Sequence, residues 1–136
     1  MAEFAYVKTA SYVGDDLRRS KPHVFVVGDP ATWERIVRGA DRRKDALSAQ
    51  TGDDIFILAA GDDNQRILAV CHEMVHLRLW RLYGGDVPIW LDEGMAGMAG
   101  WETAWSWRRK EGKSLFRTRP GVPAARILSL DALTAL

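Results

Sequence analysis

The sequence predicts an α+β domain in which short strands come first and two long helices follow. Two apolar runs rich in β-branched and aromatic residues, His23 to Val27 and Ile55 to Ala59, are typical of buried strands. The segment from Asp62 to Leu82 is apolar almost all round, as expected of a helix inside a core. A further helical segment extends from Leu91 to about Glu111. At 136 residues, the chain is one domain with room for a real core.

The long apolar helix has clear start and stop signals. Asp62 and Asp63 are candidate N-caps, and Gly84-Gly85 is a typical stop. A shorter helix is predicted to begin at Gly28-Asp29-Pro30 and to end at Gly39. Both predictions follow from local residue chemistry.

Two segments are harder to interpret. Residues 3–20 fit neither the helical nor the strand period, and Gly14-Asp15-Asp16 is a candidate start of a short helix through Arg19. The segment from Ala46 to Thr51 fits an edge strand and an ordinary loop about equally well.

The last helical segment combines tryptophans with small residues. Trp101 and Trp105 are four residues apart and share one helix face, which we interpret as core packing. Small residues in the same segment predict a close approach to another helix; they are Gly94, Ala96, Gly97, Ala99 and Gly100.

Composition narrows the function classes. The net charge is +1, so bulk electrostatics does not point to nucleic acid or to a membrane as a partner. The single cysteine, Cys71, rules out an internal disulfide and is expected to pack in the core. The chain shows no signal-peptide pattern at its start and no apolar run of membrane-spanning length. We expect a monomer with a cytoplasmic setting by default, although the sequence leaves the compartment unknown.

The run His72-Glu73-Met74-Val75-His76 is an HExxH motif inside the long apolar helix. His72 and His76 are one turn apart on one helix face, so both imidazoles can reach one metal ion. Glu73 lies about 100° round the helix, where it can contact a metal-bound water. The alternative is a pair of core histidines hydrogen-bonded to backbone, with no metal.

Two imidazoles do not complete a catalytic zinc site. Such a site usually has three protein ligands and keeps a fourth position for water. No histidine follows His76, but the segment from Val87 to Ala96 offers a carboxylate at the start of the next helix. A third ligand is therefore available downstream of the motif.

HExxH followed by Pro88-Ile89-Trp90-Leu91-Asp92-Glu93-Gly94-Met95-Ala96 closely resembles the gluzincin metallopeptidases. The resemblance covers mainly residues 54–102. It implies that His72, His76 and Glu93 bind zinc and that Glu73 is the general base. It also implies a small zincin-like domain, in which a twisted mixed β-sheet lies over the buried motif helix and a glutamate-bearing helix follows. The edge strand of such a sheet binds the substrate backbone, for which Ala46 to Thr51 is the candidate here.

Two positions depart from the gluzincin pattern. Many gluzincins have an acidic residue four positions after the glutamate ligand, where it supports a motif histidine. Here that position is Gly97, and Asp92 is the candidate for the supporting role. Many also place a tyrosine or histidine after the glutamate ligand, to stabilise the tetrahedral intermediate. This chain has neither residue after Glu93.

The expected organisation is a single zincin-like metallopeptidase domain over residues 1–136. Residues 1–83 hold the sheet and active-site helix, residues 84–112 hold the glutamate helix, and residues 113–136 form a tail. We expect the tail either to lie across the cleft and keep the enzyme latent, or to be cut within a longer protein.

The predicted function is a zinc-dependent endopeptidase that hydrolyses peptides or proteins with a metal-activated water. The alternative is a catalytically silent regulatory or interaction module that keeps the fold and the metal. A purely structural zinc site is disfavoured, because such sites usually have four protein ligands rich in cysteine.

Overall fold

The computed structural model describes residues 1–14, 20–39, 46–60 and 62–112. The tail of residues 113–136 and the candidate helix of residues 15–19 lie outside this part. The described elements, in chain order, are α1 (Ala2–Val13), β1 (His23–Val27), α2 (Pro30–Gly39), β2 (Ser48–Thr51), β3 (Asp54–Leu58), α3 (Asp63–Tyr83) and α4 (Ile89–Lys110). The predicted α+β class is confirmed. Within these ranges, no helix is long and apolar enough to span a bilayer.

The described strands form one mixed sheet in the order β1-β3-β2. β1 runs parallel to β3, with Val24 opposite Ile55, and β2 runs antiparallel to β3, with Ser48 opposite Ile57. β2 is therefore an edge strand. Of the two interpretations of the segment from Ala46 to Thr51, edge strand or loop, the strand is confirmed. Its pairing with β3 supplies hydrogen bonds that a loop would have to find elsewhere.

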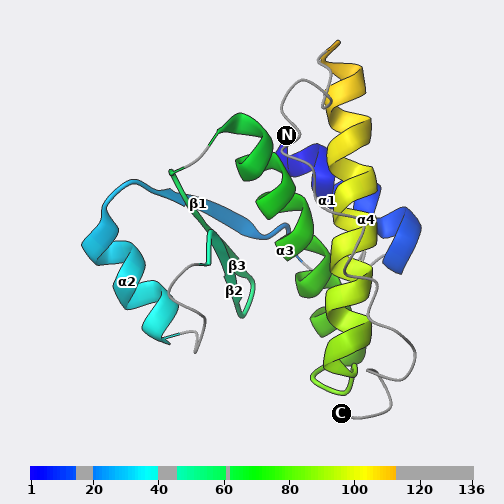
Figure 1. Cartoon of the computed structure of the whole chain (residues 1–136). Helices are drawn as coiled ribbons and strands as arrows, with labels where there is room; N and C mark the ends of the chain where they lie inside the picture. The colour runs from blue at the N-terminus through cyan, green and yellow to red at the C-terminus, as the bar shows by residue number, and fades with distance from the viewer. Residues whose placement is uncertain (15–19, 40–45, 61, 113–136) are drawn as a thin grey trace, which may run out of the picture.

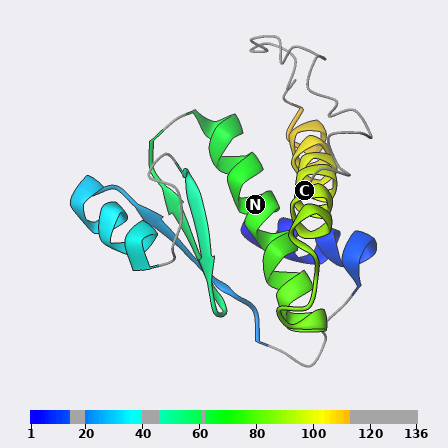
Figure 2. The ribbon, with the colours of Figure 1, turned by 60° about the horizontal axis from the view of Figure 1, so that its bottom comes forward.

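The sheet lies between α2 and α3 (Figures 1 and 2). On the α3 side, Ile55 and Ile57 are fully buried and join the apolar core of that helix. On the other side, Ala49 packs with Trp33 and Val37 of α2. Successive residues of a strand point to opposite faces, so one short sheet serves two packing layers.

Helix α3 begins and ends where its sequence predicts. The Asp62 side chain accepts from the backbone N–H of Gln65, and the Gln65 side chain accepts from the N–H of Asp62. This capping box satisfies N–H groups that have no partner inside the helix. At the other end, Gly84 has a φ of 67°, a conformation that glycine adopts without strain. The bounds of the motif helix are thus set locally.

Helix α1 was not predicted. It spans twelve residues and packs against α3 and α4. Its buried positions are Ala5, Thr9 and Val13, of which two are small or polar, so they leave no strong apolar period in the sequence. Gly14, with a φ of 110°, follows the end of this helix.

The core role predicted for Trp101 and Trp105 is wrong for Trp101, which is 42% exposed, whereas Trp105 is half-buried. The buried face of α4 consists of small residues instead: Ala96, Ala99, Gly100, Thr103 and Ala104. A Cβ on Gly100 would lie 3.0 Å from the backbone N and Cα of His72. The predicted close helix approach is confirmed at Gly100, but Gly94 and Gly97 face open space. Because the helices touch almost backbone to backbone, the contact has no room for an indole ring.

Candidate metal centre

The two motif histidines lie side by side in the middle of α3. Their Nε2 atoms are 2.9 Å apart, and the rings meet edge to face with centroids 4.6 Å apart. The side chain of His76 is only 4% exposed, whereas that of His72 is 33% exposed. One turn of helix thus presents two ring nitrogens to the same point.

Glu93 comes to this point from the first turns of α4. Its Oε2 atom lies 3.6 Å from His72 Nε2 and 3.8 Å from His76 Nε2. The three ligand atoms lie within 4.8 Å of one another. The structure therefore brings together all three residues that the sequence singled out as ligands, from two different helices.

The spacing of these donors can be compared with what zinc requires. A tetrahedral ion with ligand bonds of about 2.0–2.2 Å holds its ligand atoms about 3.3–3.6 Å apart. Of the three observed separations, 3.6 Å lies at the upper limit of this range, 2.9 Å lies below it and 3.8 Å lies just above it. Small side-chain rotations would bring all three into it. A set of two imidazoles and one carboxylate also leaves a fourth position for water, as in catalytic zinc sites. The residues present therefore fit zinc.

Asp92 holds the second nitrogen of His76. Its Oδ1 atom lies 2.7 Å from His76 Nδ1. A carboxylate only accepts hydrogen bonds, so Nδ1 carries the proton, and in the neutral ring Nε2 keeps its lone pair. That is the tautomer that a metal needs on this side of the ring. The position that the gluzincin pattern fills with an acidic residue, Gly97, has no side chain to offer.

The protonation of His72 also suits a ligand. Its pKa is lowered, first because burial disfavours the charged imidazolium and second because a positive charge on His76, when that ring is protonated, repels one on His72. The carboxylates of Glu73, Glu93 and Asp92 act in the opposite direction but do not reverse the shift. A neutral imidazole is the form that binds a metal, so the environment favours the binding form.

Glu73 lies next to His72 and is 3% exposed. Its Oε1 atom accepts a hydrogen bond from Ser48 Oγ at 2.8 Å. Its Oε2 atom is buried and has no hydrogen-bond partner among the described residues. A buried acceptor in this state is costly, so a hydrogen-bond donor such as a water is expected at this oxygen. Sequence reasoning missed Ser48, whose one signal was its place in the candidate edge strand.

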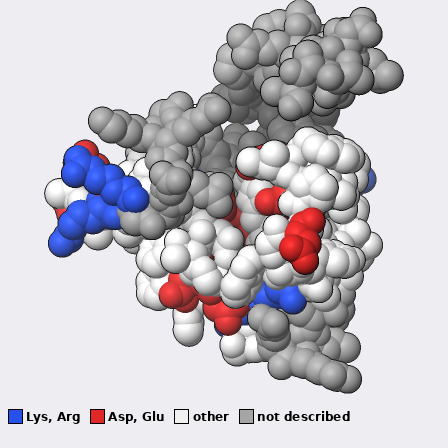
Figure 3. Space-filling view, turned by 90° about the horizontal axis from the view of Figure 1, so that it is seen from below, with Lys and Arg blue, Asp and Glu red and all other residues white. Residues whose placement is uncertain are grey.

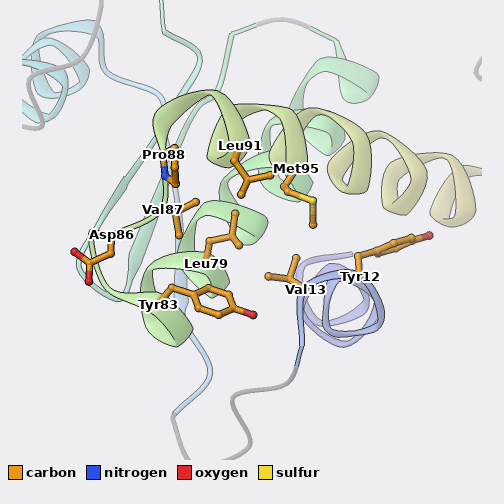
Figure 4. A pocket seen from close by; sticks show the side chains of 9 residues that line it. All are labelled: Tyr12, Val13, Leu79, Tyr83, Asp86, Val87, Pro88, Leu91 and Met95. Carbon is orange, nitrogen blue, oxygen red and sulfur yellow. The ribbon is translucent and has the colours of Figure 1, made fainter.

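Two cavities flank this region. A small one, of about 130 Å³, has His76 and Asp92 in its wall together with Gln50 and Trp80 of β2 and α3. A larger one, of about 520 Å³, lies between α1, α3 and the start of α4 and is mostly apolar; side chains such as Tyr12 and Met95 line it (Figure 4). None of the three candidate ligands lines the larger cavity. Of these two cavities, the small one is thus the one that a candidate ligand, His76, lines.

Charged side chains of both signs lie on the face of the molecule seen from below (Figure 3). Seen from below, acidic side chains are spread over the described surface, and the largest group of basic ones lies at the side where α2 projects (Figure 3).

Comparison of the chain with protein-family models, with curated proteins and with solved structures gives no significant match in any of the three.

Proposed function

We propose that this chain is a zinc-dependent endopeptidase. The observation that carries the proposal is the meeting of ligand atoms of His72, His76 and Glu93 within 4.8 Å of one another. Next to His72 lies the buried Glu73 carboxylate, one oxygen of which has no hydrogen-bond partner in the part of the chain that the structure describes. The resemblance of the HExxH motif and the Trp90 to Ala96 segment to gluzincins supplies the substrate class, a peptide bond in a peptide or protein.

Each residue has a distinct role in this proposal. Zinc, when bound by His72, His76 and Glu93, would lower the pKa of water and polarise the scissile carbonyl. Glu73 takes a proton from the attacking water and passes it to the leaving amine. Asp92 keeps His76 in its metal-binding tautomer.

A catalytically silent metal-binding module is the second candidate. The observation in its favour is that no tyrosine or histidine follows Glu93 to stabilise a tetrahedral intermediate. The buried Glu73 argues against it, because a module without chemistry gains nothing from a desolvated carboxylate beside its metal.

Latency through residues 113–136 is a separate part of the proposal. If this tail covers the cleft, a chain that ends at Gly112 hydrolyses peptides faster than the full chain. Equal rates for the two chains would remove this part and leave the peptidase proposal untouched.

The proposal is tested by metal content and hydrolysis measured on the same samples. We expect about one zinc per chain in the wild type and in Glu73→Gln, and loss of the metal in His76→Ala. Hydrolysis of a fluorogenic peptide library should fall about 10²- to 10⁴-fold in Glu73→Gln, since the base is lost while the metal stays. Zinc-loaded wild type and Glu73→Gln that are equally inactive would favour the silent module. A chain that takes up no zinc even after reconstitution would exclude both.

A further inference from the structure

We infer that Ser48 is a positioning residue for Glu73, which rests on the proposed function of Glu73 as the base. The Ser48 hydroxyl donates to one carboxylate oxygen, Oε1, at 2.8 Å. The other oxygen, Oε2, is buried without a partner among the described residues. The two oxygens therefore have different tasks: one fixes the carboxylate to the sheet, and the other is left for the attacking water.

The sheet register explains why this serine meets the base. Ser48 pairs with Ile57 in the antiparallel ladder between β2 and β3. Residues directly opposite each other point to the same face, and Ile57 is buried in the core on the α3 side. Ser48 therefore points towards α3, whereas its neighbour Ala49 points to the α2 side. A shift of one residue in β2 would turn the hydroxyl away from Glu73.

Proton transfer by Glu73 requires its side chain to be held in one orientation. A glutamate has three rotatable side-chain bonds, and a base must lie within hydrogen-bond reach of the proton that it takes. A hydrogen bond from a hydroxyl to a carboxylate is charge-assisted and stronger than a neutral one. The bond from Ser48 thus holds Glu73 in one orientation before the substrate arrives. The same bond links the edge strand to the base.

The first test compares Ser48→Ala with Ser48→Thr in the zinc-loaded full chain. Ser48→Ala leaves the carboxylate free to rotate, so we expect kcat to fall about 10- to 100-fold. KM should stay within about twofold, because the lost bond acts on the reacting group and not on substrate binding. Ser48→Thr restores a hydroxyl on the same strand and should recover most of the rate.

A measurement of zinc affinity distinguishes a positioning role of Ser48 from general damage to the structure. This affinity should stay within about threefold in Ser48→Ala, since Ser48 bonds the base and not a ligand. The matched control is Thr51→Ala, which removes a hydroxyl from an exposed position of the same strand and should leave kcat unchanged. If Ser48→Ala kept the wild-type kcat, or if Ser48→Thr were as slow as Ser48→Ala, the positioning role would be overturned.

A second measurement needs no activity. Urea unfolding of the metal-free full chain is compared for wild type, Ser48→Ala, Glu73→Leu and the double variant. If the bond is formed, the loss of Ser48 should raise the unfolding constant about three- to tenfold more with Glu73 present than with leucine there. Additive effects would show that the contact is not made and would overturn the inference whatever the kinetics. A third outcome is that Ser48 and Glu73 are coupled in unfolding while the zinc-loaded wild type does not hydrolyse peptides. That outcome would reject the proposed function, and the hydrogen bond would then have a structural role only.

Discussion

His76 and Asp92 form a hydrogen bond of 2.7 Å between the middle of α3 and the first turn of α4. The next residue along α4, Glu93, approaches the opposite nitrogen of the same imidazole ring. Two consecutive carboxylates thus lie on the two sides of one histidine: Asp92 is hydrogen-bonded to Nδ1, and Glu93 lies near Nε2. Both depend on the distance between α3 and α4.

The support from Asp92 should be measurable as zinc affinity. Asp92→Ala removes the acceptor for Nδ1, so the ring loses its preferred tautomer and orientation. We expect zinc to bind about 10- to 100-fold more weakly, as is usual for the partners of metal-binding histidines. Competition with a chromophoric chelator measures this affinity. Asp86→Ala, at an exposed position of the loop before α4, is the matched control, and similar affinities for the two variants would contradict the role of Asp92.

The approach of the two helices depends on Gly100. In Gly100→Ala, the new Cβ would lie 3.0 Å from backbone atoms of His72, so α4 must move away. We expect the free energy of unfolding to fall by about 1–3 kcal/mol and zinc affinity to fall with it, because Glu93 moves with α4.

Gly97→Ala is the control for Gly100→Ala on the same helix. A Cβ there meets nothing within 4 Å. Since alanine favours a helix more than glycine does, this variant should be more stable by about 0.5–1 kcal/mol. Urea unfolding of the metal-free chain measures both. Changes of the same sign in the two variants would show that steric contact with His72 is not the cause.

Arg78 should be a large contributor to stability, although it lies outside the metal centre. It is 1% exposed, and its guanidinium donates to Thr9 Oγ1 and to the carbonyls of Tyr6 and Gly14 in and after α1. Arg78→Ala leaves these acceptors without this donor, so we expect a loss of roughly 3–5 kcal/mol in thermal or urea unfolding.

A surface arginine provides the comparison for Arg78. Arg38→Ala removes an exposed ion pair with Glu34 on α2 and should cost no more than about 0.5 kcal/mol. Equal losses in the two variants would mean that burial of Arg78 contributes nothing.

Cys71 should be unreactive in the folded chain. Burial raises the pKa of its thiol to about 12, so the nucleophilic thiolate is scarce at pH 8. Iodoacetamide should label the chain only after unfolding, as followed by intact mass. Rapid labelling of native protein at pH 8 is incompatible with this burial.

The same shift makes stability depend on pH. Between the ordinary thiol pKa of 9.0 and about 12, the unfolded chain releases this proton and the folded chain keeps it. The contribution of Cys71 is therefore fully present below pH 9 and is lost as the pH rises through this window. Cys71→Ala should remove this part of the dependence in urea unfolding measured from pH 8 to pH 10.

The elements that the sequence predicts well are those with strong local signals. β1 and α3 have dense apolar runs, and α3 has a capping box at Asp62. β1 forms as a strand, but the prediction that it is buried is wrong: Phe25 is 44% exposed and Val26 65% exposed, since β1 lies at an edge of the sheet. α1 lacks such a signal, because its buried face includes Ala5 and Thr9, and it owes its place to packing against α3 and the bonds from Arg78. For Trp101 the sequence predicts a core position that the structure does not show. The helical spacing of the tryptophans favours burial, but the face of α4 that packs against α3 is the one with Gly100, where the two backbones come close together.

The candidate site also has one part that the local sequence determines and another that depends on tertiary contacts. That His72 and His76 lie one turn apart is determined by the sequence alone, because the period of an α-helix places them so. The order of residues along the chain does not place Glu93, Asp92 or Ser48. Their positions depend on a helix–helix distance that a single glycine permits and on the register of an edge strand. Both are long-range contacts, so only the tertiary structure decides which carboxylate meets the imidazoles and which hydroxyl meets the base.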